Sequence, residues 1–169
     1  MIFLLKRTKL LYNPYMKVSR DYKQTVSALI LNEDNLVLLT HNKNHGPNFW
    51  KMPQGGVEPE ESLEEAIKRE IQEELSSTAF SVLKKSGIDY RYTWPKDTQK
   101  KKGFVGPKIS FFILRCDDPS TLKPNLEIEE LDGIKWVDLE TLSSQFSTLP
   151  EFEDTIKKLV LEIKQVVGL

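Results

Sequence analysis

The sequence predicts an α+β domain, in which a mixed β-sheet is packed by two or three helices. Short apolar runs bounded by turn residues recur along the chain, which is typical of strands. A central segment and the C-terminal segment instead repeat apolar residues every three or four positions, which is typical of amphipathic helices. The chain of 169 residues is long enough for one domain with a full hydrophobic core.

The predicted strands begin with a hairpin. Residues 25–31 and 36–39 are apolar and flank a polar turn, which favours antiparallel pairing. A short strand is expected at 49–52, ended by Pro53 and the pair Gly55-Gly56. Later apolar runs predict strands at 80–83, 90–94, 109–115 and 134–137, and polar loops are expected at 41–48 and 96–106.

The central helix has a clear predicted start. Ser62 and Glu65 match a capping box, and the helix is expected to continue to about Ser76. Its apolar stripe consists of Leu63, Ile67, Ile71 and Leu75. A short helix is expected at 138–142, and an amphipathic helix at 151–167 closes the chain. The inward residues of that last helix are predicted to be Phe152, Ile156, Leu159, Val160, Ile163 and Val167.

Composition restricts the possible functions. The formal net charge is −1, so binding to nucleic acid would have to come from a local basic patch. The single cysteine, Cys116, excludes an intrachain disulfide and a thiolate zinc site. It favours a reducing compartment, and a cytoplasmic location is therefore expected.

The N-terminal segment is expected to lie outside the domain. Its apolar start, residues 1–5, is too short for a signal-peptide core, and no stretch of the chain approaches the length of a membrane span. We expect residues 1–20 to form an extension, with Met16 as an alternative start, and residues 21–169 to form a single domain.

The acids of the central helix point to a site. At roughly 100° per residue, Glu70 and Glu74 fall within about 20° of Leu63, on the face that should meet the core. Glu73 lies on one flank of the same stripe, beside Ala66. Clustered carboxylates that face inward are unfavourable unless cations balance them, and Mg²⁺ or Mn²⁺ prefers oxygen ligands. The alternative is a solvated acidic face paired with Lys and Arg.

The residues around these acids resemble a known motif. Gly55, Glu61 and the run Arg69-Glu70-Ile71-Gln72-Glu73-Glu74 stand at the spacing of the Nudix box. This multi-residue pattern identifies the chain as similar to the Nudix hydrolases. The box usually ends in glycine and an aliphatic residue, whereas Ser76 and Ser77 stand here, which affects the helix exit and not the acids.

The resemblance implies a fold and a metal site. The fold is an α/β/α sandwich with a loop–helix–loop catalytic motif. Glu70, Glu73 and Glu74 would bind Mg²⁺ or Mn²⁺, with the carbonyl of Gly55 as a further ligand. Arg69 would orient the carboxylates, Gly56 would allow close approach of phosphates, and Glu61 would support the loop.

Two further segments are similar to a subset of the family. Residues 50–57, Trp-Lys-Met-Pro-Gln-Gly-Gly-Val, resemble a segment shared by bacterial RNA 5′-pyrophosphohydrolases and asymmetric diadenosine tetraphosphate hydrolases, as do Arg-Tyr-Thr-Trp-Pro at 91–95. Residues 130–137 resemble a segment whose glutamate lies near the metals. Glu130 is therefore a candidate metal ligand or general base, with Glu127 and Glu129 as competitors.

Substrate contacts are expected from the same segments. The candidates are Lys51, Gln54, Gly56, Tyr92, Lys100, Lys102 and Lys108. The lysines would hold a polyphosphate or an RNA backbone as point charges, and Tyr92 would stack on a base. The alternatives are a solvated lysine loop and core packing of Tyr92. This chain also departs from these relatives, with Gly106-Pro107-Lys108-Ile109 in place of a glutamine-containing segment and with His41, Asn42 and Lys23 where arginines are common.

The implied reaction is metal-dependent attack of water on phosphorus, with Glu73, Glu130 and Arg69 as the catalytic residues. The implied partner is a nucleotide polyphosphate, either 5′-triphosphate RNA, which would release pyrophosphate, or a dinucleoside polyphosphate such as diadenosine tetraphosphate. Hydrolysis of small nucleoside triphosphates and a non-catalytic nucleotide-binding role are the alternatives.

Overall fold

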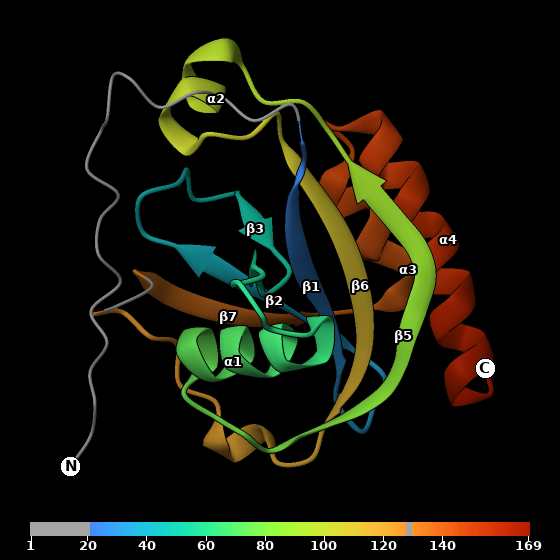
Figure 1. Ribbon diagram of the computed structural model, residues 1–169. Helices are drawn as coiled ribbons and strands as arrows, with labels where there is room; N and C mark the ends of the chain where they lie inside the picture. The colour runs from blue at the N-terminus through green and yellow to red at the C-terminus, as the bar shows by residue number, and fades with distance from the viewer. Residues whose placement is uncertain (1–20, 128–129) are drawn as a thin grey trace.

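A mixed β-sheet forms the centre of the molecule, and helices cover both of its faces (Figure 1). The computed structural model describes residues 21–127 and 130–169, so the expected extension at 1–20 and the competitor Glu129 lie outside the described residues. The strands are β1 (Lys23–Leu31), β2 (Val37–Asn42), β3 (Trp50–Lys51), β4 (Gln54–Gly56), β5 (Phe80–Arg91), β6 (Pro107–Cys116) and β7 (Leu131–Val137). The helices are α1 (Leu63–Leu75), α2 (Lys96–Lys102), α3 (Leu139–Leu142) and α4 (Pro150–Val167), with 3₁₀ turns η1 (Pro119–Thr121) and η2 (Ser143–Phe146).

The sheet is mixed, as predicted. Its strand order is β3-β2-β1-β6-β5, with β4 paired to β1 and β7 paired to β2. The β1–β6 pair is parallel from Lys23 opposite Pro107 to Leu31 opposite Arg115, whereas the other strand pairs are antiparallel. The predicted α+β class and the β1–β2 hairpin are confirmed.

Strand β1 divides the core into two layers. Val26, Ala28 and Ile30 belong to the apolar cluster on the α1 side of the sheet, whereas Leu29 and Leu31 belong to the cluster on the α4 side. A strand with residues buried on both faces has a nearly continuous apolar sequence, and β1 shows this pattern from Val26 to Leu31. The two clusters make the molecule a three-layer sandwich.

The start of α1 is confirmed in detail. Ser62 is the N-cap, its side chain accepts a hydrogen bond from the Glu65 amide, and the Glu65 carboxylate accepts from the Ser62 amide. The helix ends at Leu75, and Ser76 takes the left-handed conformation (φ 53°) that glycine more often supplies at this position. The helix therefore ends in the usual left-handed C-cap conformation although serine replaces the glycine of the box.

Three expectations about local structure were wrong. Strand structure is present at 80–83 and 90–91 as expected, but the two predicted strands are parts of one strand, β5, which passes two register shifts against β6 and ends at Arg91 rather than at 94. The polar loop expected at 96–106 contains α2, because lysines form helices well and Gly103 (φ 77°) ends the helix. Gly55 and Gly56 do not end a strand but belong to β4. Glycine has a low strand propensity, and pairing with Val26 and Thr25 of β1 stabilises the strand conformation here.

The short helix expected at 138–142 is α3, with Asp138 as its N-cap. Five of the six residues predicted to face inward on α4 are buried, and Val167 packs partly buried against the same cluster. No helix of the described part of the chain is both long and apolar enough to cross a membrane.

Candidate active site

The acids of α1 lie where the helical phase predicts. The exposed fractions of Glu70 and Glu74 are 1% and 2%, and the side chain of Glu73 is 34% exposed. Two carboxylates therefore face the interior of the molecule, and a third lies at the edge of the same face. The alternative of a wholly solvated acidic face is wrong for this helix.

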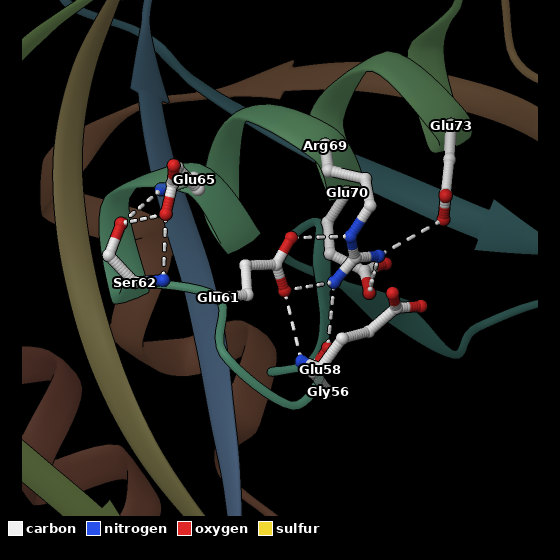
Figure 2. A network of polar contacts seen from close by, with 8 residues as sticks. All are labelled: Gly56, Glu58, Glu61, Ser62, Glu65, Arg69, Glu70 and Glu73. Carbon is white, nitrogen blue, oxygen red and sulfur yellow. Dashed lines mark hydrogen bonds and ion pairs between the residues drawn. The ribbon is translucent and has the colours of Figure 1, made fainter.

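Arg69 links two of these acids, Glu70 and Glu73, to the loop before the helix (Figure 2). Its guanidinium donates to both carboxylate oxygens of Glu61, from Nε at 2.7 Å and from Nη2 at 2.8 Å. Nη1 donates to Glu70 Oε1 at 2.8 Å and to Glu73 Oε2 at 3.4 Å, and Nη2 donates to the Gly56 carbonyl at 2.9 Å. Because the guanidinium is a rigid fork, these contacts fix both the loop and the carboxylates.

The Arg69–Glu61 pair is also the electrostatic centre of this network. The hydrogen bonds from Arg69 are the largest cause that lowers the pKa of Glu61 below its ordinary value, and the same bonds raise the pKa of Arg69. Glu61 further accepts from the Glu58 amide at 2.9 Å. Glu61 therefore supports the loop, in agreement with its expected role.

Glycine is required at position 55 by contact. A Cβ there would lie 1.9 Å from Glu70 Cδ and about as close to both carboxylate oxygens. Only glycine lets this buried carboxylate lie against the backbone of β4. A buried carboxylate beside partly buried backbone, with two further carboxylates on the same helix face, is an oxygen-only donor set that fits a hard divalent cation.

Glu74 is balanced by a lysine from β3. Lys51 Nζ lies 3.2 Å from Glu74 Oε1, and the Lys51 side chain is 25% exposed. Within residues 21–127 and 130–169, no three acidic, histidine or cysteine side chains converge as a ready-made metal cage. The carboxylates are instead paired with Lys51 and Arg69, which balance their charge.

Glu130 directly precedes β7 and is exposed, with a left-handed backbone (φ 58°). Its carboxylate accepts a hydrogen bond from Asn44 Nδ2, and its carbonyl accepts from the Lys43 amide at 3.0 Å. The loop between β2 and β3 thus holds Glu130. No sequence signal singled out Asn44, because this contact joins residues 86 positions apart. The competitor Glu127 is also exposed.

Of the candidate substrate contacts, Gly56 and Lys102 lie in one basic region. A Cβ at Gly56 would lie 2.6 Å from Lys23 Nζ, so this ammonium lies against the loop. Lys102 Nζ lies 4.8 Å from the centre of the Trp94 ring. Burial lowers the pKa of Lys102, and the nearby charges of Lys23 and Lys101 lower it further.

The other candidates are more dispersed. Gln54 is half-buried in β4, and Tyr92 is 43% exposed with its ring 5.9 Å from that of Tyr90. Lys100 lies 3.9 Å from Asp97, and Lys108 lies 3.6 Å from Asp89. Lys100 and Lys108 therefore pair with acids that do not belong to α1.

Comparison with known proteins agrees with this geometry. A family model described as the NUDIX domain matches residues 21–160. The RNA pyrophosphohydrolase of Marinomonas sp. (strain MWYL1) is 33% identical over 123 residues, which cover 69% of this chain and 75% of the relative.

Two solved structures share the fold. The Escherichia coli dihydroneopterin triphosphate pyrophosphohydrolase superposes with a TM-score of 0.63 and 19% identity, covering 85% of this chain and 99% of that one. The Caenorhabditis elegans Ap4A hydrolase, in a binary complex, gives a TM-score of 0.61 and 16% identity, covering 83% and 98%. The extent of the family match and the identity to the Marinomonas relative lead to one conclusion: this chain belongs to the Nudix family and is a hydrolase.

Proposed function

We propose that this Nudix hydrolase cleaves phosphoanhydride bonds of nucleotide polyphosphates with the help of Mg²⁺ or Mn²⁺, and that its substrate is 5′-triphosphate RNA, from which it releases pyrophosphate. The observation that carries the proposal is the burial of Glu70 and Glu74 beside Glu73, on a helix fixed by Arg69. The choice of RNA is supported by the 33% identity to a protein named RNA pyrophosphohydrolase.

The proposed metal ligands are Glu70, Glu73, Glu74, Glu130 and the Gly55 carbonyl. Bound divalent cations would lower the pKa of water and neutralise charge on the bridging and leaving oxygens. Within this set Glu70 is held against Gly55 and by Arg69, so it enters the site preoriented. Glu73 lies at the solvent edge of the same helix face, where a phosphate can approach it.

The other residues act by position and charge. Glu130 is proposed to accept the proton of the attacking water, since its exposed carboxylate is held only by a neutral amide among the described contacts. Lys51, Gln54 and Gly56 would contact the phosphates next to the metals. Lys102, whose ammonium lies over the Trp94 ring and near Lys23, would contact the phosphate chain farther from the metals.

The remaining candidate contacts belong to the same proposal. Tyr92 would stack on a base, and Lys100 and Lys108 would attract the nucleic-acid backbone after leaving their exposed acidic partners. Exposed ion pairs stabilise a protein by about 0–1 kcal/mol, so a polyanion can displace these partners easily. Residues 21–169 as one domain and a cytoplasmic location are also parts of the proposal.

The test is product analysis on a panel of substrates. Triphosphate RNA, diadenosine tetraphosphate and ATP are each incubated with the purified chain, with and without Mg²⁺ or Mn²⁺. We expect metal-dependent release of pyrophosphate and monophosphate RNA. Conversion of diadenosine tetraphosphate to ATP and AMP at a higher kcat/KM would replace RNA by a dinucleotide as substrate. Nucleotide binding without any product would contradict catalysis.

A further inference from the structure

The carboxyl end of α1 is held by a segment that does not belong to the Nudix box. The last four carbonyls of a helix need partners outside it. Here the Ser76 amide donates to Gln72 at 3.0 Å, and the amide of Lys123 donates to Leu75 at 2.9 Å. The remaining two carbonyls, those of Glu73 and Glu74, both bind Asn125.

Asn125 uses its side chain and its backbone for these contacts. Its Nδ2 donates to the Glu73 carbonyl at 2.9 Å, and its amide donates to the Glu74 carbonyl at 2.9 Å. Two consecutive proposed metal ligands are therefore fixed through a single residue that lies about 50 positions later in the chain, as the separation of 52 between Glu73 and Asn125 shows.

The same residue is bonded to the neighbour of Glu130. The carbonyl of Asn125 accepts from the Leu131 amide at 3.1 Å, and Leu131 is 1% exposed as the first residue of β7. Glu130 precedes it directly and is held in its left-handed conformation by the Lys43 amide. Figure 1 shows the chain at residues 122–127, between β6 and β7, passing the end of α1.

We propose that Asn125 is a positioning residue that fixes Glu130 relative to the carboxylates of α1. The proposal rests on the proposed function, in which Glu130 and those carboxylates act on the same phosphate. Pairing with β2 sets where β7 lies, and Asn125 adds a direct link between the end of α1 and the residue next to Glu130. A donor is needed at the side chain, because an oxygen there would face the Glu73 carbonyl, which is also an acceptor.

The experiment is a double-mutant cycle with a matched control. Asn125→Ala is made in the wild-type chain and in Glu130→Gln, and kcat and KM are measured with Mn²⁺ at a temperature where all variants are folded. The control is Thr121→Val, which removes the 2.6 Å contact between Thr121 Oγ1 and Ser77 Oγ. That contact docks the same segment to the same helix end without touching Glu73, Glu74 or Leu131.

We expect Asn125→Ala to lower kcat roughly tenfold or more with KM within about twofold, because displacement of a reacting group by ~1 Å is costly to the rate. In the Glu130→Gln background the same change should lower kcat by less than about twofold, since residues that act through one another are not additive. Thr121→Val should lower the melting temperature comparably while leaving kcat near wild type in both backgrounds.

Two results would overturn the inference. One is an equal loss of kcat from Asn125→Ala in both backgrounds, which would mean that Asn125 does not act through Glu130. The other is a loss of kcat from Thr121→Val as large as that from Asn125→Ala, which would reduce the role to docking. Absence of metal-dependent hydrolysis in the wild-type chain would instead remove the proposed function itself.

Discussion

Helices α1 and α4 cover opposite faces of the same sheet, yet they bury different chemistry (Figure 1). The buried residues of α4 are all apolar, whereas those of α1 include Glu70 and Glu74. Buried carboxylates oppose folding unless ion pairs compensate them, and here Arg69 and Lys51 do so. Helix α4 therefore contributes to stability through apolar burial, while α1 carries an electrostatic penalty at the residues that we propose as metal ligands.

The largest effect on catalysis is expected from a change at Glu73 of α1. Glu73→Gln keeps the size of the side chain but removes the charge, so we expect turnover to be abolished, with kcat reduced by at least about 10²- to 10³-fold, as when one group that stabilises transition-state charge is lost. The melting temperature should stay unchanged, because the side chain is 34% exposed.

The control for Glu73→Gln is Glu64→Gln on the same helix. Glu64 is exposed and pairs with Lys68 at 2.7 Å on the solvent face. The kcat of the Glu64→Gln variant should therefore equal that of wild type. Near-normal activity of Glu73→Gln would remove the metal assignment.

The opposite result is expected from α4. Ile156 is fully buried, and Ile156→Ala should lower the free energy of unfolding by about 2–5 kcal/mol while kcat of the folded protein is kept. Urea unfolding and kinetics below the transition check both. Leu161→Ala, at a side chain that is 62% exposed, should change the stability by less than about 0.5 kcal/mol. A large drop in kcat for folded Ile156→Ala would contradict the division of roles.

Metal binding should distinguish α1 from α4 through the melting temperature. Mn²⁺ at ~100 times its Kd should stabilise the wild-type chain by about 2.7 kcal/mol, seen as a rise in melting temperature that EDTA reverses. Ile156→Ala should show the same rise from a lower baseline, and Glu74→Gln should show little or none because it lacks a proposed ligand. Equal rises in the wild-type chain and both variants would place the bound metal elsewhere.

The smallest effect is expected in the pH dependence of stability, through the ion pair that holds the loop before α1. Arg69 lowers the folded-state pKa of Glu61 below its ordinary value of 4.5, so this pair stabilises the fold above that value and the stabilisation is lost as pH falls through the folded-state pKa. Relative to Glu61→Gln, wild type should therefore lose stability on acidification from neutral pH. Parallel stability curves for the two proteins would show that Arg69 and Glu61 are not coupled in solution.

Local patterns predicted much of this molecule. The capping box located the start of α1, and apolar spacing located β1, β6 and α4. The phase of Glu70 and Glu74 within α1 predicted their burial, because a helix fixes the direction of each side chain from sequence alone. The box spacing pointed to the family, and its residues lie on one helix and the loop before it, which makes the pattern visible in the sequence.

Contacts between distant segments were decided by the tertiary structure. Gly55 and Gly56 form a strand only because β1 lies beside them, and the run of lysines in α2 has no apolar stripe to reveal a helix. Lys51 meets Glu74, Asn44 meets Glu130 and Asn125 meets the end of α1. The sequence alone determined which carboxylates lie on the buried face of α1, because charge and helical phase are local properties. The fold decided which partners balance and position them, because sheet register brings together residues that no local pattern connects.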